Sequence, residues 1–132
     1  MSSFQGNFRF AYFSDQYDTT CAFYKEALGL VIAHSWDRSK NDKGTLFKIG
    51  LGLIEILKSP EDGGHHVEGL DYRKPQGVFM VVHVTAIDEL YQLYKSKDIP
   101  YKQDIVNQDW GHRSFSIIDP NDVVLLFIQD QF

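Results

Sequence analysis

Two opposite charges lie on stretches that are otherwise largely apolar. Arg9 falls in FRFAYF and Glu55 in LIEIL. A carboxylate is costly to bury alone, and a neighbouring guanidinium offsets much of that cost. If these stretches are adjacent strands, the pair either only neutralises itself or also orients a polar group of a ligand. We expect Glu55→Ala to leave Arg9 unpaired and to destabilise the fold by about 1–3 kcal/mol.

A second group of residues with chemical potential is the segment WGHRSF, in which His112 lies between Trp110 and Arg113. The Trp110 indole can form a platform for an aromatic ring, and Arg113 can bind a carboxylate or stack on a ring. The alternative is structural, with Trp110 covering the core and Arg113 pairing with a surface acid.

The remaining candidates point to no reaction. His65 and His66 are adjacent in a glycine-rich stretch and are interpreted as ordinary loop histidines, while His83 is expected on a covered strand face. The chain contains no G-x-S-x-G, Walker or Rossmann glycine pattern. No catalytic residue can therefore be named, and whether the protein is an enzyme stays open.

The composition is that of one globular domain. The chain has 132 residues, of which 43% are hydrophobic and 14% aromatic, and a net charge of −5. The absence of a Lys/Arg run disfavours nucleic acid, and no apolar run approaches the length of a membrane span. The single cysteine and the lack of a signal-peptide pattern at the start favour a cytoplasmic protein.

Hydrophobic periodicity predicts the order β-α-β-β-β twice. The expected strands are 8–13, 30–36, 45–49, 51–57, 77–84, 101–106, 112–118 and 123–129, with helices near 15–28 and 86–97. The two halves share a pattern that aligns Phe8 with Val78, which indicates an internal duplication. We expect an α+β fold of one domain (1–132), with module one at 6–58, a linker at 59–76 and module two at 77–132. Its mostly antiparallel mixed sheet is cupped, with the helices on the outer face.

Strand alternation divides the side chains between two faces. The set expected on the open, cavity-facing side is almost wholly apolar: Arg9, Ala11, Phe13, Leu53, Glu55, Leu57, Val78, Met80, Val82, Val124, Leu126 and Ile128. The set expected under the helices is Phe8, Phe10, Tyr12, Ile54, Ile56, Phe79, Val81, Leu125 and Phe127.

The segments AFYKEALGL (22–30), LIEIL (53–57) and WGHRSFSIIDPNDVVLLF (110–127) resemble the vicinal oxygen chelate superfamily of glyoxalases, ring-cleaving dioxygenases and bleomycin resistance proteins. The resemblance implies paired βαβββ modules around a cavity that is often completed in a homodimer. The family's metal-binding positions correspond here to Arg9, Glu55, Val78 and Leu126, of which only Glu55 can ligate a metal. We therefore expect no metal and no cofactor.

This resemblance is strongest to the metal-free, bleomycin-resistance-like members, and it implies a bacterial protein that holds a small, partly aromatic or hydrophobic molecule in a dimer cleft. The residues expected to contact the ligand are Arg9, Phe13, Glu55, Met80, Trp110, Arg113 and Leu126. One alternative is a metal-dependent lyase, isomerase or dioxygenase that uses Glu55 and histidines. Another is a partner protein whose open face is only an interface.

Overall fold

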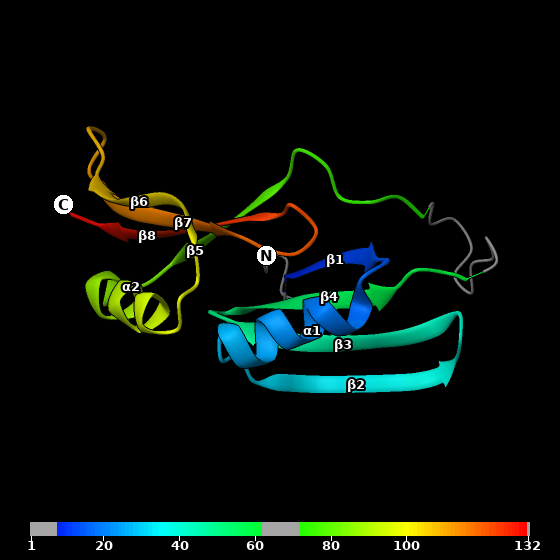
Figure 1. Cartoon of the computed structure of the whole chain (residues 1–132). Helices are drawn as coiled ribbons and strands as arrows, with labels where there is room; N and C mark the ends of the chain where they lie inside the picture. The colour runs from blue at the N-terminus through cyan, green and yellow to red at the C-terminus, as the bar shows by residue number, and fades with distance from the viewer. Residues whose placement is uncertain (1–7, 62–71, 132) are drawn as a thin grey trace, which may run out of the picture.

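The computed structural model describes residues 8–61 and 72–131, which form two four-stranded sheets and two helical segments. Sheet A has the strand order β1-β4-β3-β2 and sheet B the order β5-β8-β7-β6 (Figure 1). In each sheet the first strand runs parallel to its neighbour and the other pairs are antiparallel. The predicted α+β fold with two βαβββ modules is confirmed.

The elements of the first module are β1 (Arg9–Ser14), α1 (Tyr17–Ala22), its π-helical continuation η1 (Phe23–Ala27), β2 (Ile32–Ser39), β3 (Asp42–Ile49) and β4 (Gly52–Lys58). Those of the second are β5 (Phe79–His83), α2 (Ile87–Ser96), β6 (Tyr101–Asn107), β7 (His112–Ile118) and β8 (Val124–Asp130). The first helical segment ends at Ala27 with Leu28 as its C-cap. Gly29 follows with a φ of +74° that suits glycine, and the Leu30 N–H donates to the Tyr24 carbonyl at 3.0 Å.

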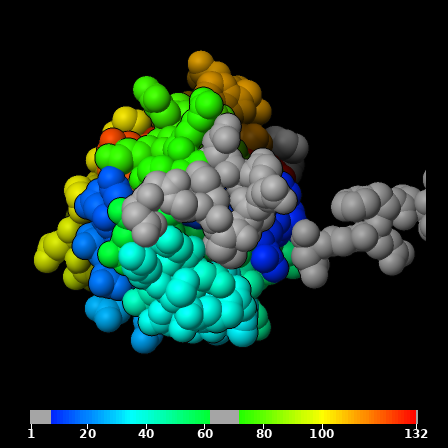
Figure 2. Space-filling model, turned by 90° about the vertical axis from the view of Figure 1, so that its right-hand side faces the viewer, coloured from blue at the N-terminus to red at the C-terminus, as the bar shows by residue number. Residues whose placement is uncertain are grey.

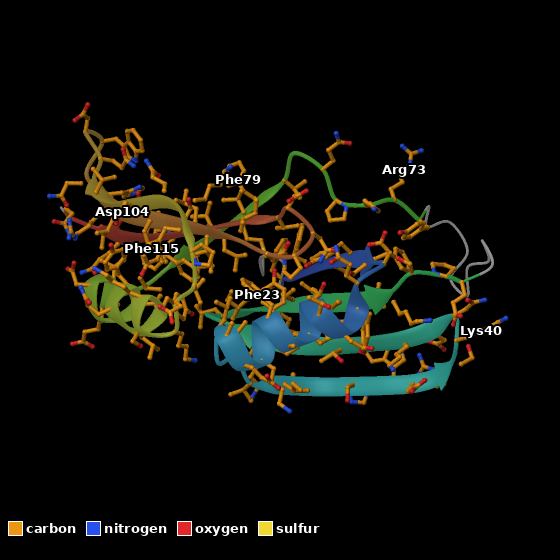
Figure 3. The ribbon with its side chains drawn as sticks, viewed as in Figure 1. Phe23, Lys40, Arg73, Phe79, Asp104 and Phe115 are labelled. Atoms are coloured by element: carbon orange, nitrogen blue, oxygen red, sulfur yellow. The ribbon has the colours of Figure 1, made fainter. Side chains whose placement is uncertain are left out.

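One hydrophobic cluster joins the two modules. The helices pack on one face of each sheet, and residues from both helices and both sheets belong to the same cluster. Its most buried members are Tyr24, Phe47, Ile54, Ile56, Ile87, Phe115, Ile117, Val123 and Leu125. Figure 3 shows Phe115 between sheet B and α2. Because the helix-covered faces meet at this shared core, the open faces of the two sheets point away from it.

A buried carboxylate also ties the modules together. Asp119, in the turn between β7 and β8, accepts hydrogen bonds from the hydroxyls of Tyr12 and Tyr24 in the first module, the latter at 2.7 Å. Its other oxygen accepts from the backbone N–H groups of Asn121 at 2.7 Å and Val123 at 3.0 Å. Burial is the main cause that raises the pKa of both tyrosines well above the ordinary value, and the Asp119 charge adds to it.

The side chain of Asn121 extends this contact into the start of the first helix. Ser14 donates to Asn121 Oδ1 at 2.8 Å, and Asn121 Nδ2 donates to the Thr20 hydroxyl at 2.7 Å. Ser14 and Thr20 are both fully buried. The Asp-Pro turn and the helix motif that carry the family resemblance are thus in direct contact, and we refer to Tyr12, Tyr24 and Asp119 as the inter-module clamp.

The side chains of β5 that face the core are not the ones predicted. Phe79 and Val81, expected under the helices, are 61% and 48% exposed, whereas Met80 and Val82 pack against the shared core. The cause is the parallel ladder, in which Met80 lies beside the covered Leu125. Every residue from 78 to 82 is apolar, so alternation alone does not determine the face.

Three further predicted placements are corrected. Val78 also packs against the shared core, and His83, expected on the covered face, is exposed on the open one, beside Ile128 in the ladder. Phe8, expected under the helices, is 74% exposed. Within the described ranges, no helix is long and apolar enough to cross a membrane.

Candidate functional site

The predicted charge pair is formed on the open face of sheet A. Arg9 of β1 and Glu55 of β4 lie on neighbouring parallel strands, and Arg9 Nη1 donates to Glu55 Oε1 at 3.4 Å. The Arg9 side chain is 46% exposed and the Glu55 side chain 15% exposed. The long, half-exposed contact makes this a weak ion pair beside an otherwise apolar strand face.

The two partners of this pair should respond differently to mutation. After Glu55→Ala, water can solvate Arg9, so we expect the free energy of unfolding to fall by less than about 1 kcal/mol. This is below the range expected from the sequence. Arg9→Ala leaves a mostly buried carboxylate without its guanidinium, so we expect a loss of about 1–2 kcal/mol. Urea unfolding measures the loss of unfolding free energy in both variants. A larger loss for Glu55→Ala than for Arg9→Ala would contradict the view that Arg9 is the more exposed partner.

The far edge of the same face carries an ordered tryptophan. Trp36 of β2 lies flat across Gly44 of β3, so closely that a Cβ at Gly44 would come within 2.3 Å of the ring. The indole N–H of Trp36 donates to Asp42 at 2.9 Å, His34 stacks on the ring at 5.8 Å, and the Arg38 guanidinium lies 5.7 Å from the ring centre. Cation–π and stacking contacts therefore hold Trp36 at the rim of sheet A.

The near edge carries the predicted Phe13. Its ring meets Tyr72 edge-on at 5.7 Å, and Lys74 pairs with Asp15 at 2.9 Å. These contacts bring the chain that follows residue 71 beside the first strand. Figure 2 looks at this end of the molecule, with the β2–β3 hairpin in cyan and the segment after residue 71 in green above it.

The open face of sheet B contains a hollow of about 420 Å³. Its apolar floor comes from Val81, Leu126 and Ile128, and polar side chains from β6, β7 and the loop between them surround it. The full lining is Val81, Gln103, Gln108, Trp110, His112, Ser114, Leu126 and Ile128. None of these is Lys, Arg, Asp or Glu, so the hollow suits a neutral ligand with apolar surface and a few hydrogen-bonding groups.

Trp110 stands at this hollow as an exposed but hydrogen-bonded ring. Trp110 is 67% exposed, and its indole N–H donates to His112 Nδ1 at 3.2 Å. His112 Nε2 lies 3.2 Å from Asp130 Oδ1. Of the sequence-predicted ligand contacts, Trp110 and Leu126 are thus brought together on sheet B, while Arg9, Phe13 and Glu55 lie on sheet A.

Arg113 and Met80 lie away from both open faces. Arg113 shares its strand face with the covered Phe115 and donates to Asp88 of α2 at 2.8 Å and to Asn107 at 3.1 Å. This is the surface-acid pairing that the sequence left as its alternative. Met80, as described above, faces the shared core.

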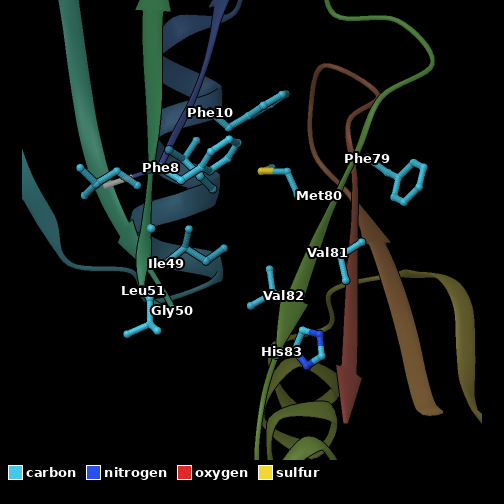
Figure 4. A pocket seen from close by; sticks show the side chains of 13 residues that line it. Phe8, Phe10, Ile49, Gly50, Leu51, Phe79, Met80, Val81, Val82 and His83 are labelled. Atoms are coloured by element: carbon cyan, nitrogen blue, oxygen red, sulfur yellow. The ribbon is translucent and has the colours of Figure 1, made fainter. Parts of the chain in front are cut away.

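Met80 instead lines a groove between the two modules. The groove has a volume of about 760 Å³ and lies between β5 and the region of β1 and β4, with apolar walls (Figure 4). Phe8, Phe10 and Ile49 stand on one wall, and Met80 and Val82 extend toward them from the other. Leu51 at its edge is fully exposed. The groove is a second apolar surface, which shares only Val81 with the lining of the hollow on sheet B.

The residues at the family's metal positions do not fit a metal ion. Glu55 is engaged by Arg9, and Leu126 carries no donor atom; Val78 carries none either and packs against the shared core instead of facing the open side. In the ranges 8–61 and 72–131, no three His, Cys, Asp or Glu side chains converge as a metal site would require. His65 and His66 lie outside the described residues.

The paired βαβββ modules, each with one helix-covered and one open sheet face, define the class of protein. A family model described as Glyoxalase/Bleomycin resistance protein/Dioxygenase superfamily matches residues 8–127. The chain belongs to this superfamily, as the resemblance implied. Among curated proteins, none matches the sequence significantly.

Solved structures share this fold at low identity. A lactoylglutathione lyase from Agrobacterium tumefaciens is 16% identical with a TM-score of 0.74, and the alignment covers 97% of this chain and 96% of that one. TioX from Micromonospora sp. ML1 is 13% identical with a TM-score of 0.74, covering 96% and 99%. A bleomycin resistance determinant encoded on the transposon Tn5 is 22% identical with a TM-score of 0.69, covering 97% and 100%. The fold is therefore shared with an enzyme and with a resistance protein alike.

Proposed function

We propose that this protein binds a small, neutral, partly aromatic molecule in a metal-free cleft and that Trp110 is its stacking platform. The observation that carries the proposal is an exposed indole, held by a hydrogen bond beside an apolar hollow on an uncovered sheet face. Aromatic rings prefer offset or edge-on contact with such a platform. The single cysteine of the chain is consistent with a cytoplasmic location.

Binding without a metal is favoured over the lyase, isomerase or dioxygenase alternative. That chemistry would need three or four ligands around one ion. The Arg9–Glu55 pair occupies the one usable position of the family's set. We assign no step of any reaction to this site.

Trp110→Ala should weaken binding of acridone, a neutral planar aromatic probe. Loss of a stacking contact of about 0.5–1.5 kcal/mol predicts a Kd about two- to twelvefold higher. Fluorescence titration measures it. Leu51→Ala is the control, because Leu51 is also an exposed apolar residue but lies at the inter-module groove. If Leu51→Ala loses affinity and Trp110→Ala does not, the ligand binds in that groove and the proposal for Trp110 is contradicted.

We further propose that two copies of the chain complete the cleft. In one chain both open faces point away from the shared core, so Arg9 and Glu55 cannot face Trp110 across a single cavity. A second copy can lay the open face of its sheet A over sheet B of the first. Phe79, which Figure 3 shows on the open side of sheet B, then becomes buried against the partner.

Phe79→Asp should therefore dissociate the dimer. A charge placed at a covered apolar position is costly, so we expect the mass measured by light scattering to fall from two chains to one. Leu93→Asp, at a 47% exposed position on the outer side of α2, should leave the mass unchanged. A wild-type protein that elutes with the mass of one chain would contradict the two-copy cleft.

A further inference from the structure

The hydrogen bond that holds Trp110 depends on the protonation pattern of its partner. The indole N–H can only donate, so His112 Nδ1 must be an unprotonated acceptor for the 3.2 Å contact to form. In a neutral imidazole the proton then lies on Nε2, which is 3.2 Å from Asp130 Oδ1. Asp130 thereby selects the tautomer of His112 that can accept from Trp110.

We propose that His112 and Asp130 are positioning residues for Trp110, fixing the plane of its indole ring at the hollow of sheet B. An indole that is two-thirds exposed has little packing to orient it, so its hydrogen bond to His112, with Asp130 3.2 Å from the other ring nitrogen, sets its direction. The inference rests on the proposed function for its consequence in ligand binding. The orientation of the ring itself can be measured without any ligand.

Protonation of His112 removes the hydrogen bond that it accepts from Trp110. A second proton on the imidazole makes Nδ1 a donor, which then faces the indole N–H of Trp110, also a donor. Among the described residues, the titratable groups facing His112 are Asp130 of β8 and His83 of β5, whose ring centre is 6.3 Å away. The neighbouring Arg113 is directed to the opposite face, toward Asp88. A charged imidazole can still pair with Asp130 through Nε2, but it can no longer accept from Trp110, so its protonation releases the indole.

The experiment uses Trp110 as its own reporter. The chain contains two tryptophans, so Trp36→Phe leaves Trp110 as the single emitter. In this background we compare His112→Asn, whose side-chain oxygen branches at the position of Nδ1 and cannot gain a proton, with His112→Leu, which has no acceptor. Time-resolved fluorescence anisotropy measures the freedom of the ring, and circular dichroism confirms that each variant is folded.

We expect slow ring motion with histidine or asparagine at position 112 and fast motion in His112→Leu. On acidification from about pH 8 to about pH 5, the anisotropy should fall with His112 present and stay constant in His112→Asn. The fall should persist in His83→Asn. An anisotropy independent of pH in the Trp36→Phe protein, or a pH-dependent fall that survives in His112→Asn, overturns the proposal, and these readouts remain valid if His112→Leu does not fold.

Acridone binding separates this inference from the proposed function. We expect His112→Leu to raise the Kd by about two- to twelvefold, as Trp110→Ala does, and His112→Asn to restore it. If the ring is mobilised in His112→Leu while acridone affinity is unchanged in both His112→Leu and Trp110→Ala, the positioning role stands and the proposed function fails. If Trp110→Ala weakens binding but His112→Leu neither mobilises the ring nor weakens binding, the positioning role fails alone.

Discussion

Replacing Asp119 with alanine is expected to lower the free energy of unfolding by about 3–5 kcal/mol, in the range measured when one partner of a buried charged contact is removed. The substitution leaves the hydroxyls of Tyr12 and Tyr24 and the N–H groups of Asn121 and Val123 without their acceptor. All but Asn121 are buried. For a domain whose total stability is about 5–15 kcal/mol, this is a large fraction.

Control variants distinguish the loss of the clamp from a general effect of removing an acidic side chain. Asp109→Ala removes an exposed carboxylate in the β6–β7 connection and should change stability by less than about 0.5 kcal/mol. Tyr12→Phe and Tyr24→Phe should each cost about 1–3 kcal/mol, and neither should add its full cost once Asp119 is gone, because they share that partner. Denaturant titration of the set measures these values. A loss below about 1 kcal/mol in Asp119→Ala would mean that the clamp does not hold the modules together.

Alkaline pH should destabilise the protein through the same tyrosines. Their pKa values are raised well above 10 in the folded state, chiefly by burial, whereas the unfolded chain ionises near 10. A raised folded pKa means that the stabilisation is fully present below pH 10 and is lost as pH rises above it, because the unfolded state then binds fewer protons. Each tyrosine removes about 1.4 kcal/mol per pH unit in that interval. Burial also raises the pKa of Tyr94 to about 12, which adds to the fall.

The measurement is the free energy of unfolding between about pH 9 and about pH 12, together with the tyrosinate absorbance of the folded protein. The wild type should lose stability steeply above pH 10 while these tyrosines remain protonated. In the double variant Tyr12→Phe/Tyr24→Phe, the free energy of unfolding should fall less steeply with pH, because unfolding then releases about two fewer protons. Equal slopes in the two proteins would show that the clamp tyrosines ionise as freely when folded as when unfolded.

Two features of the fold and site could be predicted from particular residues. Alternation could be expected to place Arg9 and Glu55 each on the open face of its strand, and the family resemblance implied that both positions face one cavity; the ladder shows the two strands as neighbours. Gly29 could be expected to end the first helical segment, and its positive φ bears this out.

The facing of β5 could not be read from alternation, because VFMVV is apolar on both sides. The internal repeat contained the missing information. Aligning Phe8 with Val78 places Met80 on the position of Phe10, which lies against the shared core, and the assignment of Met80 to the open face went against that alignment. A repeat therefore fixes strand facing where hydrophobicity does not.

A similar signal was present around His112. In HRSFSII, the polar His112 and Ser114 alternate with the covered Phe115 and Ile117, which places Arg113 on the helix side with Asp88. The polar lining from Gln103 and Gln108 has no comparable signal, since it depends on a β6 strand whose pairing contains register shifts. The inter-module clamp likewise depends on contacts across about a hundred residues of chain, which no local pattern reports.

A crystal structure of the protein grown with acridone tests the proposed binding site directly. We expect a dimer with the acridone ring stacked on Trp110 of one copy, facing the Arg9–Glu55 strand face of the other, and with no metal ion bound at Glu55. Acridone bound in the groove between β1 and β5, or a metal ion held by Glu55 with histidines, would contradict it.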